Sequence, residues 1–322
     1  MNELAQSSGF SGHNVEGGFD VDRVRQDFPI LGRQVHGKPL VYFDSGASAQ
    51  KPRAVIDAMT EVLEAQYTNV HRGAHYLSQT LTDRYEGVRE KIAAFLNAPS
   101  ENEIVITRNT TEAINLVAAT YGRKFLNKGD GVLISDMEHH ANIVPWQLLR
   151  DEIGIELKVA PIDDRGVLDM DAYAALLDGN TKLVAMTHCS NVLGTMLPGK
   201  EIVRLAHERG IPVLLDGSQA VVHSAVDVQD LNADFYVFTG HKLYGPTAIG
   251  VLYGKADLLA QMPPYQGGGD MIATVTYEKT TYQEPPYRFE AGTPPIVEAI
   301  GLGAAIDYVS AIGMDAIAAH EK

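Results

Sequence analysis

A lysine at position 242 follows one of the most apolar segments of the chain. The run FYVFTGHKLYGP (235–246) predicts a buried strand that carries Thr239, His241 and Lys242 to its carboxyl end, where open α/β sheets bind ligands. A lysine that is desolvated there loses its proton more easily and becomes an amine that can condense with an aldehyde. Thr239 and His241 can donate hydrogen bonds to an anion. An isolated Gly-His-Lys is more often an exposed strand end, so the interpretation needs support from other segments.

Asp216 ends a second apolar segment, PVLLDGSQA (212–220). A carboxylate at a strand end can pair with a protonated pyridine nitrogen and keep such a ring electron-withdrawing. Gln219 comes one short turn later, within reach of a phenolic oxygen on the same ring. The alternative is that Asp216 only caps the turn that follows the strand.

A third segment predicts an anion site at the start of a helix. EIVIT (103–107) runs into RNTTEAINLVAAT (108–120), which places Thr110 or Thr111 at a helix N-terminus. Free N–H groups and the positive end of the helix dipole favour a phosphate there. The alternative is an ordinary N-cap threonine.

Two further loops follow strands and carry polar side chains. DMEHHANIVPW (136–146) offers His139, whose ring can stack on a planar cofactor and shuttle protons. THCSNVLG (187–194) offers Asn191, which can orient a substrate carboxylate or a ring oxygen, or can simply be a turn residue. Neighbouring histidines point apart and no cysteine cluster accompanies them, so no metal site is predicted. A phosphate site, a ring stacker, a pyridine partner and a reactive amine together predict pyridoxal 5′-phosphate (PLP).

Strands alternate with helical patterns from Pro39 onward, which predicts an α/β fold with a doubly wound, mostly parallel sheet. Residues 19–35 predict a short helix and turn with Asp20 or Asp22 as N-cap, and the final residues predict a helix start capped by Asp315. The predicted strands are 103–107, 131–135, 182–187, 212–216, 234–239 and 248–253, and the predicted helices are 83–96, 111–121, 141–151, 169–178 and 199–209.

Composition narrows the class of protein. The 322 residues include 26 Lys and Arg against 41 Asp and Glu, a formal charge of −15 that disfavours nucleic acid or an anionic membrane as the main partner. No apolar run approaches the roughly 20 residues needed to span a bilayer. The single cysteine, Cys189, cannot form an intramolecular disulfide, so a reducing, cytoplasmic location is expected.

Three parts are predicted along the chain. Residues 1–18, rich in Ser, Gly and Asn, predict a disordered tail. Residues 19–300 predict a large PLP-binding domain with an N-terminal segment. Residues 301–322 are expected to begin a second, smaller domain that is largely missing from this sequence.

Nine motifs, ordered from about Val41 to Pro294, give the chain a family likeness. It resembles class V aminotransferase-fold enzymes, and specifically SUF-type cysteine desulfurases, which are PLP-dependent. The resemblance implies the PLP-dependent transferase fold of the aminotransferase type. The motifs are YFDSGASAQKP, NVHRGAHYLS, RNTTEAINLVA, MEHHANIVPW, HCSNVLG, DGSQAVVH, FYVFTGHKLYGPTAIGVLY, GGGDMIATV and RFEAGTP.

The resemblance also implies a role for each matched residue. Lys242 forms the Schiff base with the cofactor and moves protons, while His139 stacks on the ring. Asp216 pairs with the pyridine nitrogen, and Gln219 approaches the phenolic oxygen. The remaining residues hold the phosphate or the substrate: Thr111, Thr239 and His241 the phosphate, and Asn191 and His71 the substrate. The enzymes of this family are homodimers, so Thr293 is expected to reach the phosphate of the partner subunit.

The implied reaction converts L-cysteine to L-alanine and leaves the sulfur as an enzyme persulfide. A sulfur-acceptor protein then receives it for iron–sulfur cluster assembly. The family's nucleophilic cysteine and its carboxylate-binding arginine lie in the C-terminal domain, so neither has a counterpart in residues 1–322. Cys189 is expected to be a small buried apolar residue instead. Cofactor binding is therefore predicted more firmly than turnover.

Three alternatives share the same scaffold. A selenocysteine lyase, an aminotransferase or a kynureninase-like hydrolase would use the same PLP site, and a cysteine on the loop of the C-terminal domain would favour sulfur chemistry over these. The alternative that is not an enzyme is a non-catalytic fragment with the PLP-dependent transferase fold. Absence of an absorption band from bound PLP would favour that last interpretation.

Overall fold

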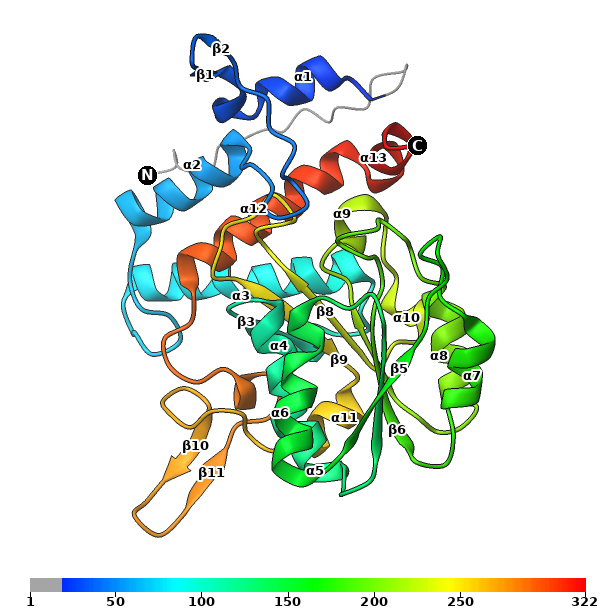
Figure 1. The fold of residues 1–322 in the computed structure, drawn as a ribbon. Helices are drawn as coiled ribbons and strands as arrows, with labels where there is room; N and C mark the ends of the chain where they lie inside the picture. The colour runs from blue at the N-terminus through cyan, green and yellow to red at the C-terminus, as the bar shows by residue number, and fades with distance from the viewer. Residues whose placement is uncertain (1–18) are drawn as a thin grey trace.

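A seven-stranded sheet forms the middle of the molecule, in the order β3-β9-β8-β7-β6-β4-β5 (Figure 1). The structure is a computed structural model that describes residues 19–322, so the predicted disordered tail lies outside the described residues. The strands are β3 (Ile104–Thr107), β4 (Gly131–Ser135), β5 (Glu156–Ala160), β6 (Thr181–Thr187), β7 (Val213–Asp216), β8 (Phe235–Thr239) and β9 (Gly250–Gly254).

The sheet is parallel except for one strand. β9 pairs antiparallel with both β3 and β8, whereas the pairs β4–β5, β4–β6, β6–β7 and β7–β8 are parallel. The carboxyl ends of β3, β4, β6, β7 and β8 therefore meet at one edge. The mostly parallel, doubly wound α/β fold predicted from the sequence is confirmed.

Two details of the sheet were not predicted. β9 nearly coincides with the predicted segment 248–253. It runs antiparallel because the loop 240–249 turns the chain back from the end of β8. β5 was missed altogether. It is an edge strand with Val159 45% exposed, so it lacks the continuous apolar run that marked the buried strands.

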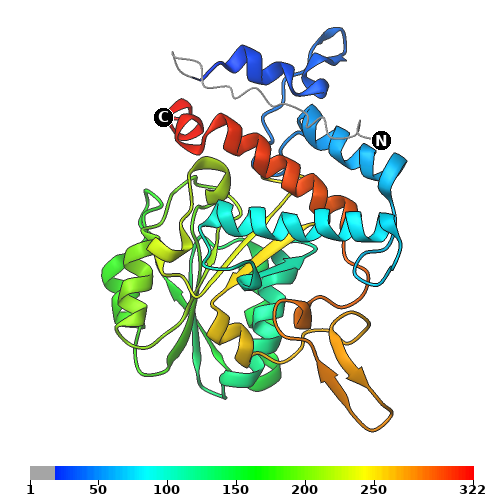
Figure 2. The same cartoon turned by 180° about the vertical axis from the view of Figure 1, so that it is seen from behind.

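Helices cover both faces of the sheet because side chains alternate along each buried strand (Figures 1 and 2). In β3, Ile104 and Ile106 belong to one apolar core, and Val105 belongs to the other. The first core includes residues of α3 (Tyr76–Leu96), α7 (Met170–Leu176), α8 (Gly199–His207) and α12 (Ile296–Ile312). The second includes residues of α4 (Thr110–Val117), α6 (Val144–Ile153) and α11 (Ala256–Gln261).

Further α-helices and two small hairpins lie in the described chain. Helices are α1 (Val21–Gln26), α2 (Arg53–Glu61), α5 (Arg123–Phe125), α9 (Ala220–His223), α10 (Val228–Leu231) and α13 (Met314–His320). Two antiparallel hairpins pair β1 (Gln34–Val35) with β2 (Lys38–Pro39) and β10 (Ile272–Val275) with β11 (Thr280–Tyr282). The second hairpin projects away from the body of the molecule (Figures 1 and 2).

The predicted caps near the two ends have different outcomes. Asp20 caps α1, because its side chain accepts a hydrogen bond from the Arg23 N–H at 3.0 Å. Asp315 is not a cap: it lies in the first turn of α13, and Gly313 occupies the N-cap position. The predicted domain boundary at residue 300 falls inside α12, which packs on α2 and α3.

α12 is buried along most of its length, as a core helix of an α/β protein would be. Within residues 19–322, no single helix is long and apolar enough to cross a membrane. α12 and α13 taken together satisfy length and composition, but a bend of 70° separates them.

Candidate active site at the strand ends

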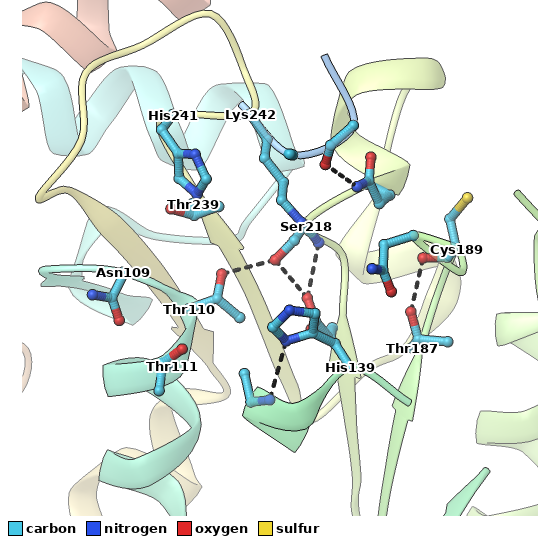
Figure 3. A pocket seen from close by; sticks show the side chains of 16 residues that line it. Asn109, Thr110, Thr111, His139, Thr187, Cys189, Ser218, Thr239, His241 and Lys242 are labelled. Carbon is cyan, nitrogen blue, oxygen red and sulfur yellow. Dashed lines mark hydrogen bonds between the residues drawn. The ribbon is translucent and has the colours of Figure 1, made fainter. Parts of the chain in front are cut away.

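A cavity of about 360 Å³ opens at the carboxyl edge of the sheet (Figure 3). It brings together nine of the residues singled out from the sequence: Thr110, Thr111, His139, Asn191, Asp216, Gln219, Thr239, His241 and Lys242. Gly46, Ala47, Asn109, Ala141, Thr187, Cys189 and Ser218 complete its wall. This cavity is referred to below as the strand-end pocket.

Lys242 stands on a tight loop between β8 and β9. The Gly240 N–H donates to the Ile249 carbonyl at 2.9 Å, and the Gly245 N–H donates to the Gly240 carbonyl at 2.9 Å. A Cβ atom at Gly240 would lie 2.5 Å from a methyl carbon of Ile249, so only glycine fits this close approach. The loop therefore fixes the backbone from which the Lys242 side chain enters the pocket.

The Lys242 amine has an unusual electrostatic setting. Desolvation lowers its pKa below the ordinary value of 10.5, and the negative charge of Asp216 opposes that shift. Among the described residues, no hydrogen bond or ion pair holds the amine. A larger fraction of Lys242 is therefore unprotonated than of a surface lysine, as condensation with an aldehyde requires.

The N-terminal segment holds the peptide group that precedes Lys242. The His241 carbonyl accepts hydrogen bonds from the Ala49 N–H at 3.0 Å and from Lys51 Nζ at 3.1 Å. Burial lowers the pKa of Lys51 to about 8. The pKa of His241 is also lowered, by burial first and then by the nearby charges of Lys242 and Lys51. Lys51 was not singled out from the sequence, although it lies in the motif YFDSGASAQKP.

Asp216 is connected to the start of α4 through Ser218. Ser218 Oγ donates to Asp216 Oδ1 at 2.6 Å and lies 2.8 Å from Thr110 Oγ1, while the Ser218 N–H donates to the same carboxylate oxygen at 3.0 Å (Figure 3). All three residues are buried. Sequence reasoning missed Ser218, although it lies in the motif DGSQAVVH between the two residues that were chosen.

Thr110 and Thr111 lie at the start of α4, as predicted, and the alternative of an N-cap threonine is wrong. Asn109, and neither Thr110 nor Thr111, is the N-cap: its side chain accepts a hydrogen bond from the Glu112 N–H at 2.9 Å. Thr110 is thereby free to meet Ser218, and all three residues line the pocket. An anion-binding helix N-terminus at this edge remains the physical interpretation.

His139 and Gln219 lie on other parts of the wall. His139 Nδ1 accepts a hydrogen bond from the Ala141 N–H at 3.1 Å, which orients the ring (Figure 3). Its pKa is lowered by partial desolvation and by Lys242 and His140, with Asp216 opposing. Gln219 Nε2 donates to the Gly46 carbonyl at 2.8 Å, which brings the N-terminal segment to the pocket.

Cys189 also lines the pocket but is set up as a structural residue. Its side chain is buried, and burial raises the pKa of its thiol. Its Sγ lies 3.8 Å from the Gly194 carbonyl. A thiol with a raised pKa is a poor nucleophile, because the thiolate is the reactive form.

Two predicted site residues lie outside the strand-end pocket. His71 lines a second cavity of about 300 Å³, and Thr293 lines another of about 170 Å³. His71 Nε2 lies 2.7 Å from Glu86 Oε1. Within one subunit the structure therefore does not bring these two residues to Lys242. His71 belongs to what we call the arginine cluster, which consists of Arg89, Glu290, Glu86, Tyr287 and His71.

The side chains of the strand-end pocket suit PLP. The pocket falls in the size range of small-ligand sites, roughly 300–1,000 Å³. It presents a desolvated amine for an aldehyde, a buried carboxylate for a pyridine nitrogen, and a helix N-terminus with threonines for a phosphate.

The fold and pocket together define a PLP-dependent enzyme of the aminotransferase type. Residues 41–322 match the family model described as aminotransferase class-V, and the chain belongs to that family. It is 59% identical over 304 residues to a protein named cysteine desulfurase from Dickeya dadantii (strain 3937), covering 94% of this chain and 74% of that one.

Solved structures show the same likeness. The cysteine desulfurase CsdA from Escherichia coli superposes with a TM-score of 0.84 at 42% identity, covering 91% of this chain and 72% of that one. A lysine-to-alanine mutant of the protein C-DES, with glycine covalently linked to its PLP cofactor, gives a TM-score of 0.75 at 25% identity over 88% of this chain and 73% of that one.

Proposed function

We propose that this chain is a PLP-dependent cysteine desulfurase that converts L-cysteine to L-alanine and passes the sulfur on as an enzyme persulfide. The observation that carries the proposal is the desolvated Lys242 amine, which lines the same cavity of about 360 Å³ as Asp216 and interacts with its charge. The family membership and the relatives named cysteine desulfurase support the choice of reaction. When bound, PLP supplies an electron-withdrawing ring that stores the electron pair released at the substrate α-carbon.

The side chains of the pocket divide the work. With PLP bound, Lys242 Nζ would hold the cofactor through its aldehyde carbon and would carry the proton of the substrate α-carbon. Asp216, whose position is fixed by Ser218, would keep the pyridine nitrogen protonated. His139 would stack on the ring, and Gln219 would bind its phenolic oxygen. The helix start at Thr110 and Thr111, together with Thr239 and His241, would hold the phosphate, and Asn191 would orient the substrate.

The sulfur-transfer step needs a thiolate that attacks the substrate sulfur and breaks its bond to carbon. We assign Cys189 no part in that step, because burial raises the pKa of its thiol.

The finer parts of the proposal concern the assembly. We infer a homodimer in which His71 and Thr293 act toward the partner's site, which accounts for their distance from Lys242 within one subunit. A sulfur-acceptor protein of iron–sulfur cluster assembly, in the cytoplasm, is the proposed recipient of the persulfide sulfur. The division into a large domain up to residue 300 and a smaller one beyond it stays a prediction.

Lys242→Ala gives the central test. We expect the purified protein reconstituted with PLP to show a visible absorption band that resists dialysis, and we expect Lys242→Ala to lose it. Lys200→Ala is the control, since Lys200 is exposed, pairs with Asp230 and does not line the pocket. A protein that stays colourless with PLP would overturn the assignment and favour a non-catalytic PLP-fold chain.

Products distinguish the chemical alternatives. L-cysteine should yield alanine in amounts equal to the sulfur released, measured by amino-acid analysis and a persulfide assay. Pyruvate or a transaminated keto acid as the main product would instead indicate an aminotransferase or lyase. Faster release of alanine from L-selenocysteine than from L-cysteine would indicate a selenocysteine lyase.

A further inference from the structure

Glu138 stands directly before His139 and is almost fully buried. Its side chain is 9% exposed and lies between the end of β4, the turn that follows it, and the end of β6. It does not line the strand-end pocket, so cofactor contact does not account for it. A buried carboxylate needs hydrogen-bond donors, because removing it from water is otherwise unfavourable.

Donors from three separate segments meet this carboxylate. Glu138 Oε1 accepts from Ser135 Oγ at 2.5 Å and from the Thr187 N–H at 2.9 Å. Glu138 Oε2 accepts from Asn142 Nδ2 at 2.8 Å. Ser135 ends β4, Thr187 ends β6, and Asn142 follows His139 by three residues. One side chain therefore joins the loop that carries His139 to a strand end that lines the pocket.

Neighbouring groups determine which partner donates in these hydrogen bonds. The Trp146 indole N–H, which can only donate, donates a hydrogen bond to Asn142 Oδ1 at 3.0 Å. Asn142 Nδ2 also donates to the Ala185 carbonyl at 3.0 Å. If the Asn142 amide were flipped, its NH₂ group would face the Trp146 N–H and its oxygen would face the Ala185 carbonyl, so this orientation is excluded. Both Asn142 and the Thr187 backbone must therefore donate to residue 138, which must accept on both oxygens.

We propose that Glu138 is a positioning residue, whose acceptor-only carboxylate holds the His139 loop against the end of β6 and so sets the ring over the cofactor site. This role rests on the proposed function, in which His139 stacks on the PLP ring. Glutamine has nearly the same shape but must present an NH₂ group to either Thr187 N or Asn142 Nδ2, and neither can accept. The loop must then shift.

The electrostatic surroundings make this role depend on pH. Burial raises the pKa of Glu138 to about 7, with Asp216 adding to the rise, while the bonds from Ser135, Asn142 and Thr187 oppose it without outweighing burial. The side chain is therefore the acceptor-only carboxylate above about pH 7, and the tests below are read on that side of the titration.

The first test uses the cofactor-free protein and does not depend on the proposed function. Histidines are labelled with ¹³C, the His139 signal is assigned by its loss in His139→Ala, and the ring is titrated by NMR. Desolvation is the largest cause of the lowered pKa of His139; Lys242 and His140 lower it further, and Asp216 opposes them. In Glu138→Gln the loop loosens and the ring gains water, so the pKa of His139 should rise toward the ordinary value of 6.5.

The sign of that shift separates positioning from simple charge. Loss of the negative charge at residue 138 would by itself lower the pKa of a neighbouring histidine. An unchanged or lowered pKa of His139 in Glu138→Gln would overturn the proposal. Glu152→Gln, which removes an exposed carboxylate paired with Arg123, is the matched control and should change nothing.

The second test measures PLP dissociation constants in a double-mutant cycle. Glu138→Gln should weaken PLP binding about tenfold in the wild-type background and less than twofold in His139→Ala, because Glu138 acts through that ring. Equal losses in both backgrounds would show a general structural role and overturn the proposal. Should wild type bind no PLP while the His139 titration behaves as expected, the proposed function fails and the positioning role stands.

A milder substitution covers the case in which Glu138→Gln does not fold. Glu138→Asp keeps an acceptor-only carboxylate but is one methylene too short to reach both Thr187 and Asn142. It should shift the His139 titration and the PLP affinity in the same directions by smaller amounts. Wild-type behaviour of Glu138→Asp in both measurements would contradict the proposal.

Discussion

The strand-end pocket and the arginine cluster both place charged groups inside the protein, but they differ in how the charges are paired. Arg89, 1% exposed, donates to both oxygens of Glu290 at 2.7 and 3.0 Å, to Glu86 at 3.0 Å and to the Ile104 carbonyl at 2.8 Å. The Lys242 amine has no such partner in the described chain, and its pKa is lowered. A fully paired cation ties segments together, whereas an unpaired, desolvated amine is available for chemistry.

The difference suggests that the two regions respond to substitution in opposite ways. The arginine cluster joins α3, β3 and the segment around Glu290, so its loss should be felt in stability. The strand-end pocket joins loops that follow finished strands, so its loss should be felt in cofactor affinity. The three predictions that follow test this contrast.

Arg89→Met should have the largest effect on stability. Glu290 would remain buried without its cation, and breaking a buried pair in this way costs about 3–5 kcal/mol in the free energy of unfolding. Urea unfolding of the cofactor-free protein measures the loss. Arg123→Met, in an exposed pair with Glu152, is the control and should change stability by less than about 1 kcal/mol. If Arg89→Met lost as little stability as Arg123→Met, or if it bound PLP more than tenfold more weakly than wild type, the contrast between the two regions would not hold.

Two glutamates, one beside the strand-end pocket and one in the arginine cluster, should give stability an opposite dependence on pH. The pKa of Glu138 is raised from 4.5 to about 7, chiefly by burial. Folding therefore takes up a proton between these values, and the contribution of Glu138 falls as pH rises from 4.5 to 7. For Glu86, hydrogen bonds and charges from His71 and Arg89 outweigh burial and lower the pKa to about 2. Its contribution falls as pH drops from 4.5 toward 2.

Unfolding free energies of wild type, Glu138→Gln and Glu86→Gln, measured from pH 3 to pH 8, test these signs. The difference between wild type and Glu138→Gln should grow as pH falls from 7 to 4.5, by at most about 3 kcal/mol. The difference between wild type and Glu86→Gln should shrink below pH 4.5, by less, since Glu86 is partly exposed to solvent. Parallel slopes for the two variants would contradict the assignment of the two regions.

Ser218→Ala should show the smallest change in stability and a clear change in binding. It removes the hydroxyl that bridges Asp216 and Thr110 but keeps the backbone N–H that also donates to Asp216. We expect PLP to bind about tenfold more weakly, equivalent to about 1.4 kcal/mol, with a stability loss of about 1 kcal/mol. Ser224→Ala, outside the pocket, is the control. Unchanged PLP affinity would show that the bridge does not position Asp216.

Much of the site could be predicted because the sheet is built from short buried runs. Each strand has four to seven residues with an apolar run in it, and polar residues follow the run at once, so Lys242, Asp216 and His139 could be placed at strand ends without knowing the fold. Parallel pairing then brings those ends to one edge. β5 was not predicted because its residues are partly exposed and form no continuous apolar run.

The sequence by itself determined the α/β class, the strand ends that form the pocket, and the residue types that make it suitable for PLP, because burial patterns and turn signals are local. Only the tertiary structure decided which polar groups meet. Ser218 bridges to Thr110 from 108 positions away, and Glu138 joins Thr187 from 49 positions away. It also placed His71 and Thr293 away from Lys242 within one subunit. Hydrogen bonding and desolvation depend on what surrounds a side chain in space, and no spacing along the chain encodes that directly.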